Sequence, residues 1–146
     1  MTVMSHDDIC QMLPHAGDMC LLDEVIAWDR GSIDCITESH RNKNIPLFYN
    51  GRLHAVNCIE YAGQATVVHG TLCWEEGMDL PNVAILVSIR DIRFSRPRLD
   101  DIAAPLQIHA DVLDILEFAS NYSFNVTAEG IEIASGRLTS KLIFEK

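Results

Sequence analysis

The longest apolar stretch of the chain, residues 53–73, predicts a single buried helix. Apolar side chains point in nearly every direction around such a helix, which is typical of a helix enclosed by the rest of the protein. At about 100° per residue, one narrow line of polar side chains interrupts this surface. It consists of Asn57, Glu60, Gln64 and Thr71.

The rest of the pattern predicts one short helix and six strands. The short helix begins after Ser5, a good N-cap residue, and ends before Pro14. Alternating or continuous apolar runs predict strands over residues 19–28, 32–40, 83–94, 105–118, 121–128 and 131–144. The first two strands are expected to form a hairpin, and the last two another across the turn at Glu129 and Gly130.

These elements predict an α+β fold in which the sheet wraps the long helix. A single apolar helix among antiparallel strands has no other element to cover it. One sheet covers only one side of a helix, so we expect the other side to meet a second subunit in at least a dimer. No linker or internal repeat divides the chain, and we expect one domain over residues 1–146.

Composition and charge argue against several functional classes. The net charge of −10 argues against nucleic acid as a partner, because phosphate binding needs clustered positive charge. The N-terminus lacks the pattern of a signal peptide, and the polar residues of the long helix disfavour membrane insertion, so we expect a cytoplasmic protein. The five cysteines are widely spread without zinc-ligand spacing, so we expect buried apolar side chains and no metal site.

Glu60 is the candidate for acid–base chemistry. In an apolar interior a carboxyl group either finds hydrogen-bond donors or keeps its proton, and a protonated carboxyl is what a general acid needs. The alternative is a side chain that meets solvent or a polar subunit interface. Gln64 lies one helical turn later, where the two side chains can hold a shared ligand or each other.

Positive charge is concentrated in one short segment. Within residues 90–98 the chain has four arginines, Arg90, Arg93, Arg96 and Arg98. A local basic patch on an acidic protein suits an anionic partner, such as a phosphate-bearing cofactor arm or an acidic carrier protein. The alternative is a strand edge that uses cations to discourage aggregation.

Several motifs resemble those of the beta-hydroxyacyl-ACP dehydratases. Residues 13–29, LPHAGDMCLLDEVIAWD, resemble the amino-terminal signature of that family, and residues 59–65, IEYAGQA, resemble its central-helix signature. Residues 88–101 fall where the family has a basic strand and the loop after it, and residues 133–144 resemble its closing strand. The motifs span nearly the whole chain in the family's order.

A closer resemblance is to the predicted dehydratases of aryl-polyene gene clusters, which have PHAG-x-MCLLD and then GRLPA before IEY. The resemblance implies a hotdog fold, with the site between two subunits. It implies loss of water from a 3-hydroxyacyl chain held as a phosphopantetheine thioester on acyl carrier protein, in fatty-acid or aryl-polyene-type synthesis. No other cofactor is expected. The second subunit is expected to be another copy or another hotdog protein.

The resemblance also assigns roles at the start of the helix. Glu60 falls on the family's helix carboxylate, which works at the hydroxyl that leaves from C3, and Gln64 falls on a supporting glutamine. Backbone amides where the helix begins, near His54, Ala55 and Val56, would face the thioester oxygen, because free N–H groups and the helix dipole suit a developing oxyanion. Asn57, on the same polar line, is a further candidate for substrate contact.

The family's catalytic histidine has no counterpart at its usual place. The family has it in G-H-F-P, and Pro46 occupies that position here. Three histidines are candidates for the base that removes the C2 proton: His15 in the amino-terminal signature, His40 at the end of the second strand, and His54 at the helix start. The remaining alternative is that no base is present. Imidazole suits this step because it exchanges protons near neutral pH.

We therefore expect a 3-hydroxyacyl thioester dehydratase that uses Glu60 with His15 or His40. Two alternatives stay open. One is a non-catalytic hotdog subunit that pairs with an active dehydratase, which the absence of G-H-F-P favours. The other is a thioesterase, in which the carboxylate activates water and the products are a free acid and a free thiol.

Overall fold

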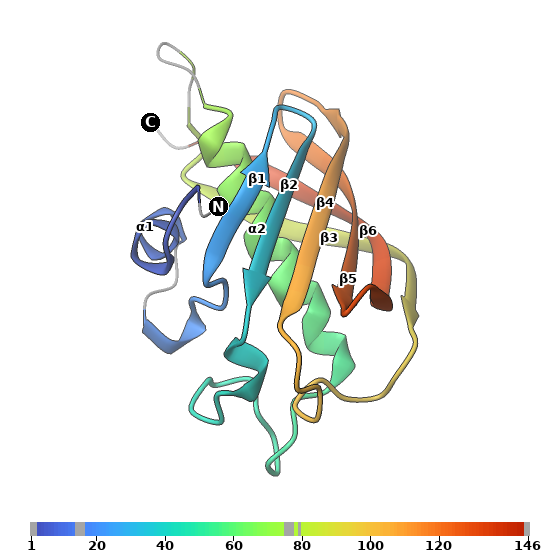
Figure 1. The fold of residues 1–146 in the computed structure, drawn as a ribbon. Coiled ribbons are helices and arrows are strands. Elements are labelled where there is room, and N and C mark those ends of the chain that lie inside the picture. The colour runs from blue at the N-terminus through green and yellow to red at the C-terminus, as the bar shows by residue number, and fades with distance from the viewer. Residues whose placement is uncertain (1–2, 14–16, 75–77, 79, 145–146) are drawn as a thin grey trace.

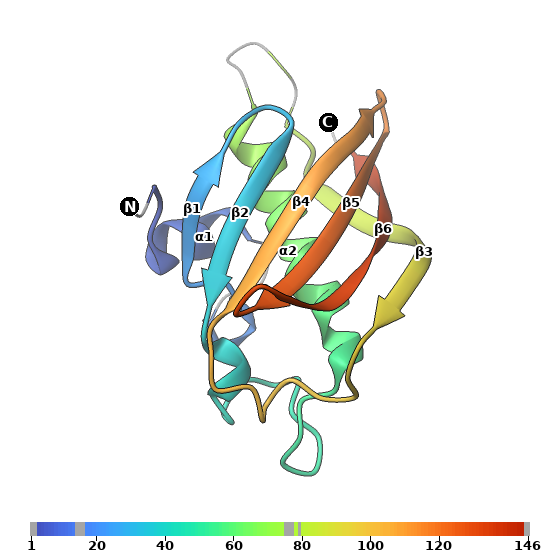
Figure 2. The ribbon, with the colours of Figure 1, turned by 45° about the vertical axis from the view of Figure 1, so that its right-hand side comes forward.

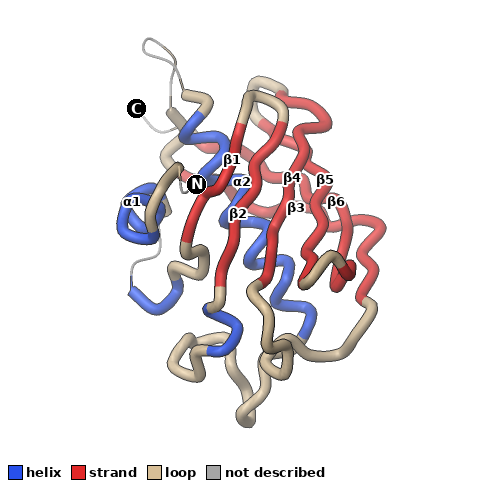
Figure 3. The backbone as a smooth tube through the Cα atoms, in the orientation of Figure 1, coloured by secondary structure: helices blue, strands red, loops and turns tan. Residues whose placement is uncertain are grey.

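The computed structural model describes residues 3–13, 17–74, 78 and 80–144 of the chain. The α-helices are α1, His6–Met12, and α2, Cys58–Leu72, and short 3₁₀ helices lie at Gly17–Met19, Ser39–Arg41 and Ala55–Asn57. The strands are β1, Glu24–Trp28; β2, Ser32–Thr37; β3, Val83–Phe94; β4, Leu106–Ile115; β5, Ala119–Ala128; and β6, Ile131–Ile143. Figure 3 marks these elements along the backbone.

The six strands form one antiparallel sheet in the order β1-β2-β4-β5-β6-β3. The sheet curves around α2, which lies against its concave face (Figures 1 and 2). The short helix α1 contacts both α2 and β1. The predicted α+β hotdog architecture, one long helix wrapped by six antiparallel strands, is confirmed.

Both predicted hairpins are present. β1 pairs with β2, and β5 pairs with β6 across a two-residue turn. Glu129 and Gly130 have φ of 51° and 77°, which is the left-handed backbone that a tight hairpin turn of this type requires. β3 occupies Val83–Phe94, the predicted range, because its apolar run and the alternation after it extend between turn residues on both sides.

The long helix begins later than its apolar pattern predicts. Residues 53–55 bond to the loop before β4 instead of starting the helix: the Leu53 amide donates to the Asp100 carboxylate at 2.9 Å, and Leu53 oxygen accepts from the Leu99 amide at 2.8 Å. The Ala55 amide donates to Pro97 oxygen at 3.0 Å. These long-range bonds hold the chain extended up to the 3₁₀ turn that precedes Cys58, so the predicted helical start at residue 53 is wrong.

A histidine and a tyrosine join the helix to the sheet inside the core. His69 on α2 is 1% exposed, and its Nδ1 accepts a hydrogen bond from the Tyr122 hydroxyl on β5 at 2.7 Å. Its Nε2 donates to the backbone oxygen of Asp29 at 2.7 Å. Both ring nitrogens are therefore satisfied by the protein, and His69 is a core histidine.

We expect Tyr122→Phe to destabilise the fold by about 1–3 kcal/mol, because it leaves a buried imidazole nitrogen without its partner. Urea unfolding followed by circular dichroism measures this change. Tyr49→Phe is the matched control, since Tyr49 is 69% exposed and should change the free energy of unfolding by less than about 0.5 kcal/mol. Equal effects of the two substitutions would contradict the structural role of the His69–Tyr122 bond.

An ion-paired histidine lies on the outer surface of the sheet. His109 on β4 faces Asp34 across the β2–β4 ladder, with Nδ1 2.7 Å from the Asp34 carboxylate, and its Nε2 is 2.9 Å from the Asp111 carboxylate. Partial burial opposes the charged ring, but the hydrogen bonds to the two carboxylates outweigh it, so the pKa of His109 is raised above its usual value.

The raised pKa makes part of the stability dependent on pH. The folded-state pKa of His109 is above the unfolded value of 6.5. The stabilisation from protonated His109 is therefore complete below about pH 6.5 and is lost as pH rises through the folded pKa. Near pH 6 we expect the free energy of unfolding of wild type to be about 0.2–1 kcal/mol larger than that of His109→Gln. The difference is small because solvent screens this partly exposed pair. Urea unfolding at pH 6 and at pH 9 tests this, and a difference that is the same at both values would refute it.

The cysteine prediction is wrong for one pair. Cys10 on α1 and Cys20, after the first 3₁₀ helix, form a disulfide with their Cα atoms 5.6 Å apart. The sequence gives no sign that α1 folds back on this segment. Cys35 and Cys58 are buried as expected, and burial raises the pKa of each thiol to about 12, which leaves both unreactive.

The sheet ends at β3 in an edge with many exposed apolar side chains. Its neighbour on one side is β6, and no described strand pairs with its other side. The exposed apolar residues of β3 are Val83, Ile85, Leu86, Val87, Ile89 and Phe94. A contiguous run of exposed apolar side chains on an unpaired strand is typical of a protein interaction surface. None of the helices in the described part of the chain is long and apolar enough to cross a membrane.

Candidate active site

Glu60 lies in the first turn of α2 and is half-buried. Its carboxylate accepts a hydrogen bond from the Gln64 amide at 3.4 Å, the i to i+4 contact that the spacing predicts. No other hydrogen bond or ion pair to Glu60 is found among the described residues. The carboxylate therefore keeps free acceptor positions for a ligand at the surface of the helix.

Gln64 also fixes the segment that leads into β1. Its side-chain oxygen accepts from the Leu21 amide at 2.9 Å, and its nitrogen donates to Met19 oxygen at 2.6 Å. Gln64 is 5% exposed, so these bonds form in the interior. Most of its hydrogen-bonding capacity is used to anchor residues 19–21 against α2, beside the carboxylate of Glu60.

The helix entrance holds the predicted substrate-binding positions. His54 is exposed and Ala55 is buried. The Asn57 side-chain nitrogen donates to the backbone oxygen of His54 at 3.1 Å. The Ala55 amide donates to Pro97 oxygen, so it is not available to a thioester oxygen. Val56 lies in the 3₁₀ helix that leads into α2, and outside the bonds within helices and strands no acceptor for its amide is found among the described residues. The helix dipole favours negative charge at this end.

His40 is enclosed by the protein. Its exposed fraction is 0%, and its Nε2 donates to Ile102 oxygen at 2.9 Å. Burial lowers the pKa of His40, so the ring is neutral near pH 7. Its Nδ1 is buried without a hydrogen-bond partner among the described residues. This nitrogen has a free lone pair, but no contact joins it to Glu60.

The other candidate bases are not brought to Glu60 either. His15 lies outside the described residues. His54 is exposed at the helix entrance, and no hydrogen bond joins any histidine of the described segments to Glu60. The described part of a single chain thus presents the carboxylate without an imidazole beside it.

The four arginines divide into two pairs. Arg96 forms an ion pair with Asp101 at 2.7 Å, and Arg98 pairs with Asp100, whose pKa is lowered by the hydrogen bond from Arg98. These two guanidinium groups support the loop that holds the helix entrance. The remaining two, Arg90 and Arg93, are exposed on β3, and no ion pair to either is found among the described residues.

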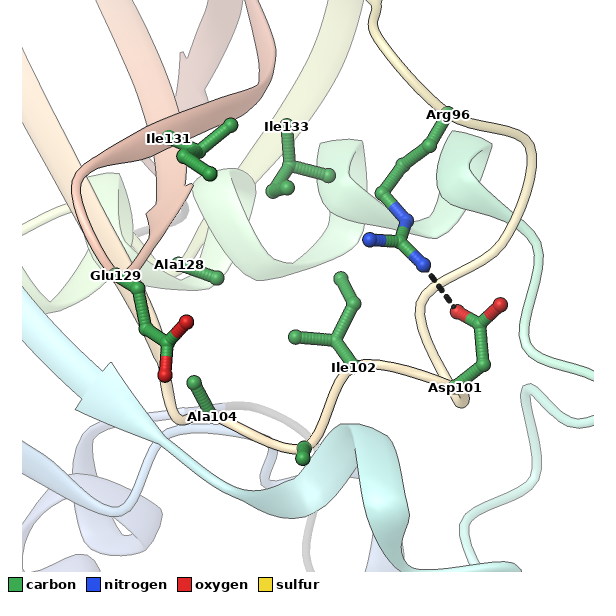
Figure 4. Close-up of a pocket in the computed structure, with 9 residues that line it drawn as sticks. Arg96, Asp101, Ile102, Ala104, Ala128, Glu129, Ile131 and Ile133 are labelled. Atoms are coloured by element: carbon green, nitrogen blue, oxygen red, sulfur yellow. Dashed lines mark hydrogen bonds and ion pairs between the residues drawn. The ribbon is translucent and has the colours of Figure 1, made fainter.

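A hollow of about 200 Å³ lies between the β5–β6 turn and the loop before β4 (Figure 4). Apolar side chains line it from both sides, with the Arg96–Asp101 pair and Glu129 at its rim. A second hollow of about 280 Å³ is lined by residues near α1, including His6, Cys20 and Asp23. Glu60 lines neither hollow. The half-buried acid group therefore lies outside both of these hollows.

An open face follows one stripe of α2. The residues along it that are not buried are Ile59, Gly63, Val67 and Gly70, and Glu60 lies at its border. A Cβ added at Gly63 or Gly70 would meet no atom within 4 Å. The sheet covers the opposite side of the helix, which leaves this stripe accessible to another molecule.

Two features of this region were not foreseen from the sequence. One is the hydrogen bond from the Leu53 amide to the Asp100 carboxylate, which shapes the helix entrance. The other is the contact of His6 with Cys10 and Cys20, which lies beside the second hollow. A local signal existed for the second, since His6 and Cys10 are four residues apart and so share one face of α1.

Comparison with known proteins agrees with this architecture. The sequence model of a family described as ApeP-like, ApeP dehydratase, matches residues 7–141. A search of curated protein sequences returns no match.

Solved structures with low sequence identity share the fold. The dehydratase heterocomplex ApeI:P from Xenorhabdus doucetiae is 21% identical with a TM-score of 0.83, over 97% of this chain and 93% of that chain. A thioesterase from Haemophilus influenzae is 16% identical with a TM-score of 0.66, and the match covers 97% of this chain and 92% of the thioesterase chain. The zebrafish thioesterase superfamily member 2 is 19% identical with a TM-score of 0.64, and the match covers 95% of this chain and 99% of the zebrafish chain.

Proposed function

Since the chain belongs to the ApeP-like dehydratase family, we propose that it is the carboxylate-bearing subunit of a dehydratase that acts on 3-hydroxyacyl thioesters. The substrate is held on the phosphopantetheine arm of acyl carrier protein, and the product is the trans-2-enoyl thioester. No other cofactor takes part. The observation that supports this proposal is the half-buried Glu60 carboxylate, bonded to Gln64, at the border of an uncovered helix face.

The reaction needs an acid and a base on the substrate. A base takes the proton from C2, the C2–C3 double bond forms, and the C3–O bond breaks. The leaving hydroxyl takes a proton from the Glu60 carboxyl and departs as water. The Val56 amide at the start of α2 stabilises the negative charge that develops on the thioester oxygen.

We propose that the base comes from a second subunit. In the described part of this chain His40 is enclosed and His69 has both ring nitrogens engaged, so neither reaches Glu60. A second hotdog subunit placed against the open stripe of α2 and the apolar edge of β3 brings its own side chains to the carboxylate. The ApeI:P dehydratase is a heterocomplex, which favours a different hotdog protein over a second copy of this chain.

The carrier protein docks near the start of the helix in this proposal. Arg90 and Arg93 are exposed on β3, and Asp91 between them is engaged by Arg137, so the two cations are placed to meet the acidic surface of a carrier protein. Arg96 and Arg98 have a supporting role, because Asp101 and Asp100 already neutralise them.

Product analysis tests the proposed reaction. The chain is assayed alone and together with a hotdog partner that has the G-H-F-P histidine, using 3-hydroxyacyl chains on the cognate carrier protein. An enoyl thioester formed by the pair supports the proposal. Free acid together with free carrier thiol would show a thioesterase instead. An absence of any product from the folded pair, tested over several chain lengths, would refute the proposed reaction.

A further inference from the structure

Three groups that bind transition metals lie together beside α1. The Cys10 sulfur is 3.4 Å from His6 Nε2, and the Cys20 sulfur is 4.0 Å from His6 Nδ1. One ligand atom from each of the three residues lies within 4.8 Å of the others. Two sulfurs and one imidazole nitrogen form a donor set that zinc prefers.

The hydrogen bonding of His6 prepares the ring for a metal. Its Nδ1 is 2.8 Å from the backbone oxygen of Leu22, so Nδ1 holds the proton and donates it. Nε2 is then the unprotonated nitrogen, and it faces the sulfur of Cys10. Metal-bound histidines commonly donate their second ring N–H to a backbone carbonyl, which fixes the tautomer and orients the ring.

The surroundings suit a dication that arrives from solvent. The second hollow, of about 280 Å³, is lined by His6 and Cys20 and by three acidic residues, Asp18, Asp23 and Glu38. The Asp23 carboxylate is 3.8 Å from His6 Nδ1. Acidic groups at the mouth of a hollow raise the local concentration of cations. A water molecule from this hollow can complete a four-coordinate site.

In this structure the two sulfurs are joined as a disulfide, and a metal requires both as thiolates. A dithiol reductant breaks the S–S bond, is itself oxidised to a disulfide, and leaves one proton on each cysteine sulfur. Zinc then displaces these two protons to solvent. The sulfurs must separate to about 3.7 Å in a tetrahedral site, and a Cα separation of 5.6 Å allows this by side-chain rotation.

We propose that His6, Cys10 and Cys20 form a binding site for one zinc ion when both thiols are reduced. Exchange with a disulfide oxidant, which is itself reduced to two thiols, re-forms the Cys10–Cys20 bond and releases the ion to solvent. In either state the link ties Cys20 to α1. Cys20 lies between Met19 and Leu21, whose backbone groups Gln64 anchors beside Glu60. The site is separate from the proposed acid–base chemistry.

Zinc titration of the full chain tests the proposal. The protein, reduced with a phosphine that is then removed under inert gas, is titrated with zinc against a chromogenic indicator of micromolar affinity. We expect one zinc ion per reduced chain, and at least tenfold weaker binding in Cys10→Ser, Cys20→Ser and His6→Asn. Cys73→Ser is the matched control, because the Cys73 sulfur makes the other cysteine–histidine contact, 3.4 Å from His69 Nε2, and it should bind as wild type does.

The oxidised wild type provides a test that does not depend on a substitution. Thiol titration in denaturant should give five free thiols in the reduced chain and three in the oxidised chain, which are Cys35, Cys58 and Cys73. The oxidised chain should bind no zinc at this affinity. The proposal is overturned if the reduced wild type binds no zinc, if Cys10→Ser binds it as tightly as wild type, or if the oxidised chain retains it.

Discussion

Glu60→Gln is expected to lower the rate of dehydration by about 10²–10⁴-fold in the assembled enzyme, the range for loss of a positioned acid or base. Glutamine has nearly the same shape and can still bond to Gln64, so the fold and the anchoring of residues 19–21 should persist. It cannot give a proton to the leaving hydroxyl. The measurement is the initial rate of enoyl thioester formation by the complex with its hotdog partner.

Glu132→Gln is the matched control for this substitution. Glu132 is an exposed glutamate on β6, and its change to glutamine should leave the rate within twofold. A Glu60→Gln complex as fast as wild type would show that this chain is a non-catalytic subunit, whose role is to shape the site of its partner. That result would leave the family membership and the fold unchanged.

Val87→Asp is expected to prevent the assembly of the two subunits. Val87 is 57% exposed near the middle of β3, on the edge that has no described neighbour. A carboxylate there must be desolvated without a partner when a second sheet edge covers it, which costs several kcal/mol. Each 1.4 kcal/mol weakens binding tenfold, so we expect dissociation of the complex at micromolar concentration. Analytical ultracentrifugation measures this directly.

The control for this second substitution is Val3→Asp, at the opposite edge of the sheet. Val3 is 54% exposed and bonds through its backbone to Val25 of β1. Its change should leave the sedimentation of the complex as it is in wild type. If Val87→Asp leaves the complex intact and Val3→Asp disrupts it, the interface lies at the β1 edge and the proposed arrangement of subunits is incorrect.

The sequence was sufficient to predict two helices and six strands in their order, but β1 begins at Glu24 and not at residue 19, and His40 lies in a 3₁₀ helix beyond the end of β2. Strand β3 matches its predicted range because an uninterrupted apolar run and a following alternation are local properties. The late start of α2 was not predictable in the same way. It depends on bonds from Leu53 and Ala55 to residues 97–100, and helix propensity contains no information about such distant partners.

The site shows the same division. The contact between Glu60 and Gln64 follows from helical spacing and is present. The choice among histidines does not follow from spacing, because burial decides whether a ring is accessible, and His40 is completely enclosed. For the arginines a local signal was available: Asp100 and Asp101 follow Arg98 closely in the sequence, and two of the four cations bond to them.

If the proposed pairing with a second hotdog subunit holds, synthesis of this chain alone leaves β3 as a sheet edge with no neighbour among the described strands. The free backbone of β3, flanked by apolar side chains such as Val87 and Ile85, is a template on which another copy can add in register. Production of both subunits at the same time and in equal amounts would cap this edge as it forms. Recovery of the chain in the soluble fraction should therefore rise when the two genes are co-expressed, and overproduction of this subunit alone should yield inclusion bodies.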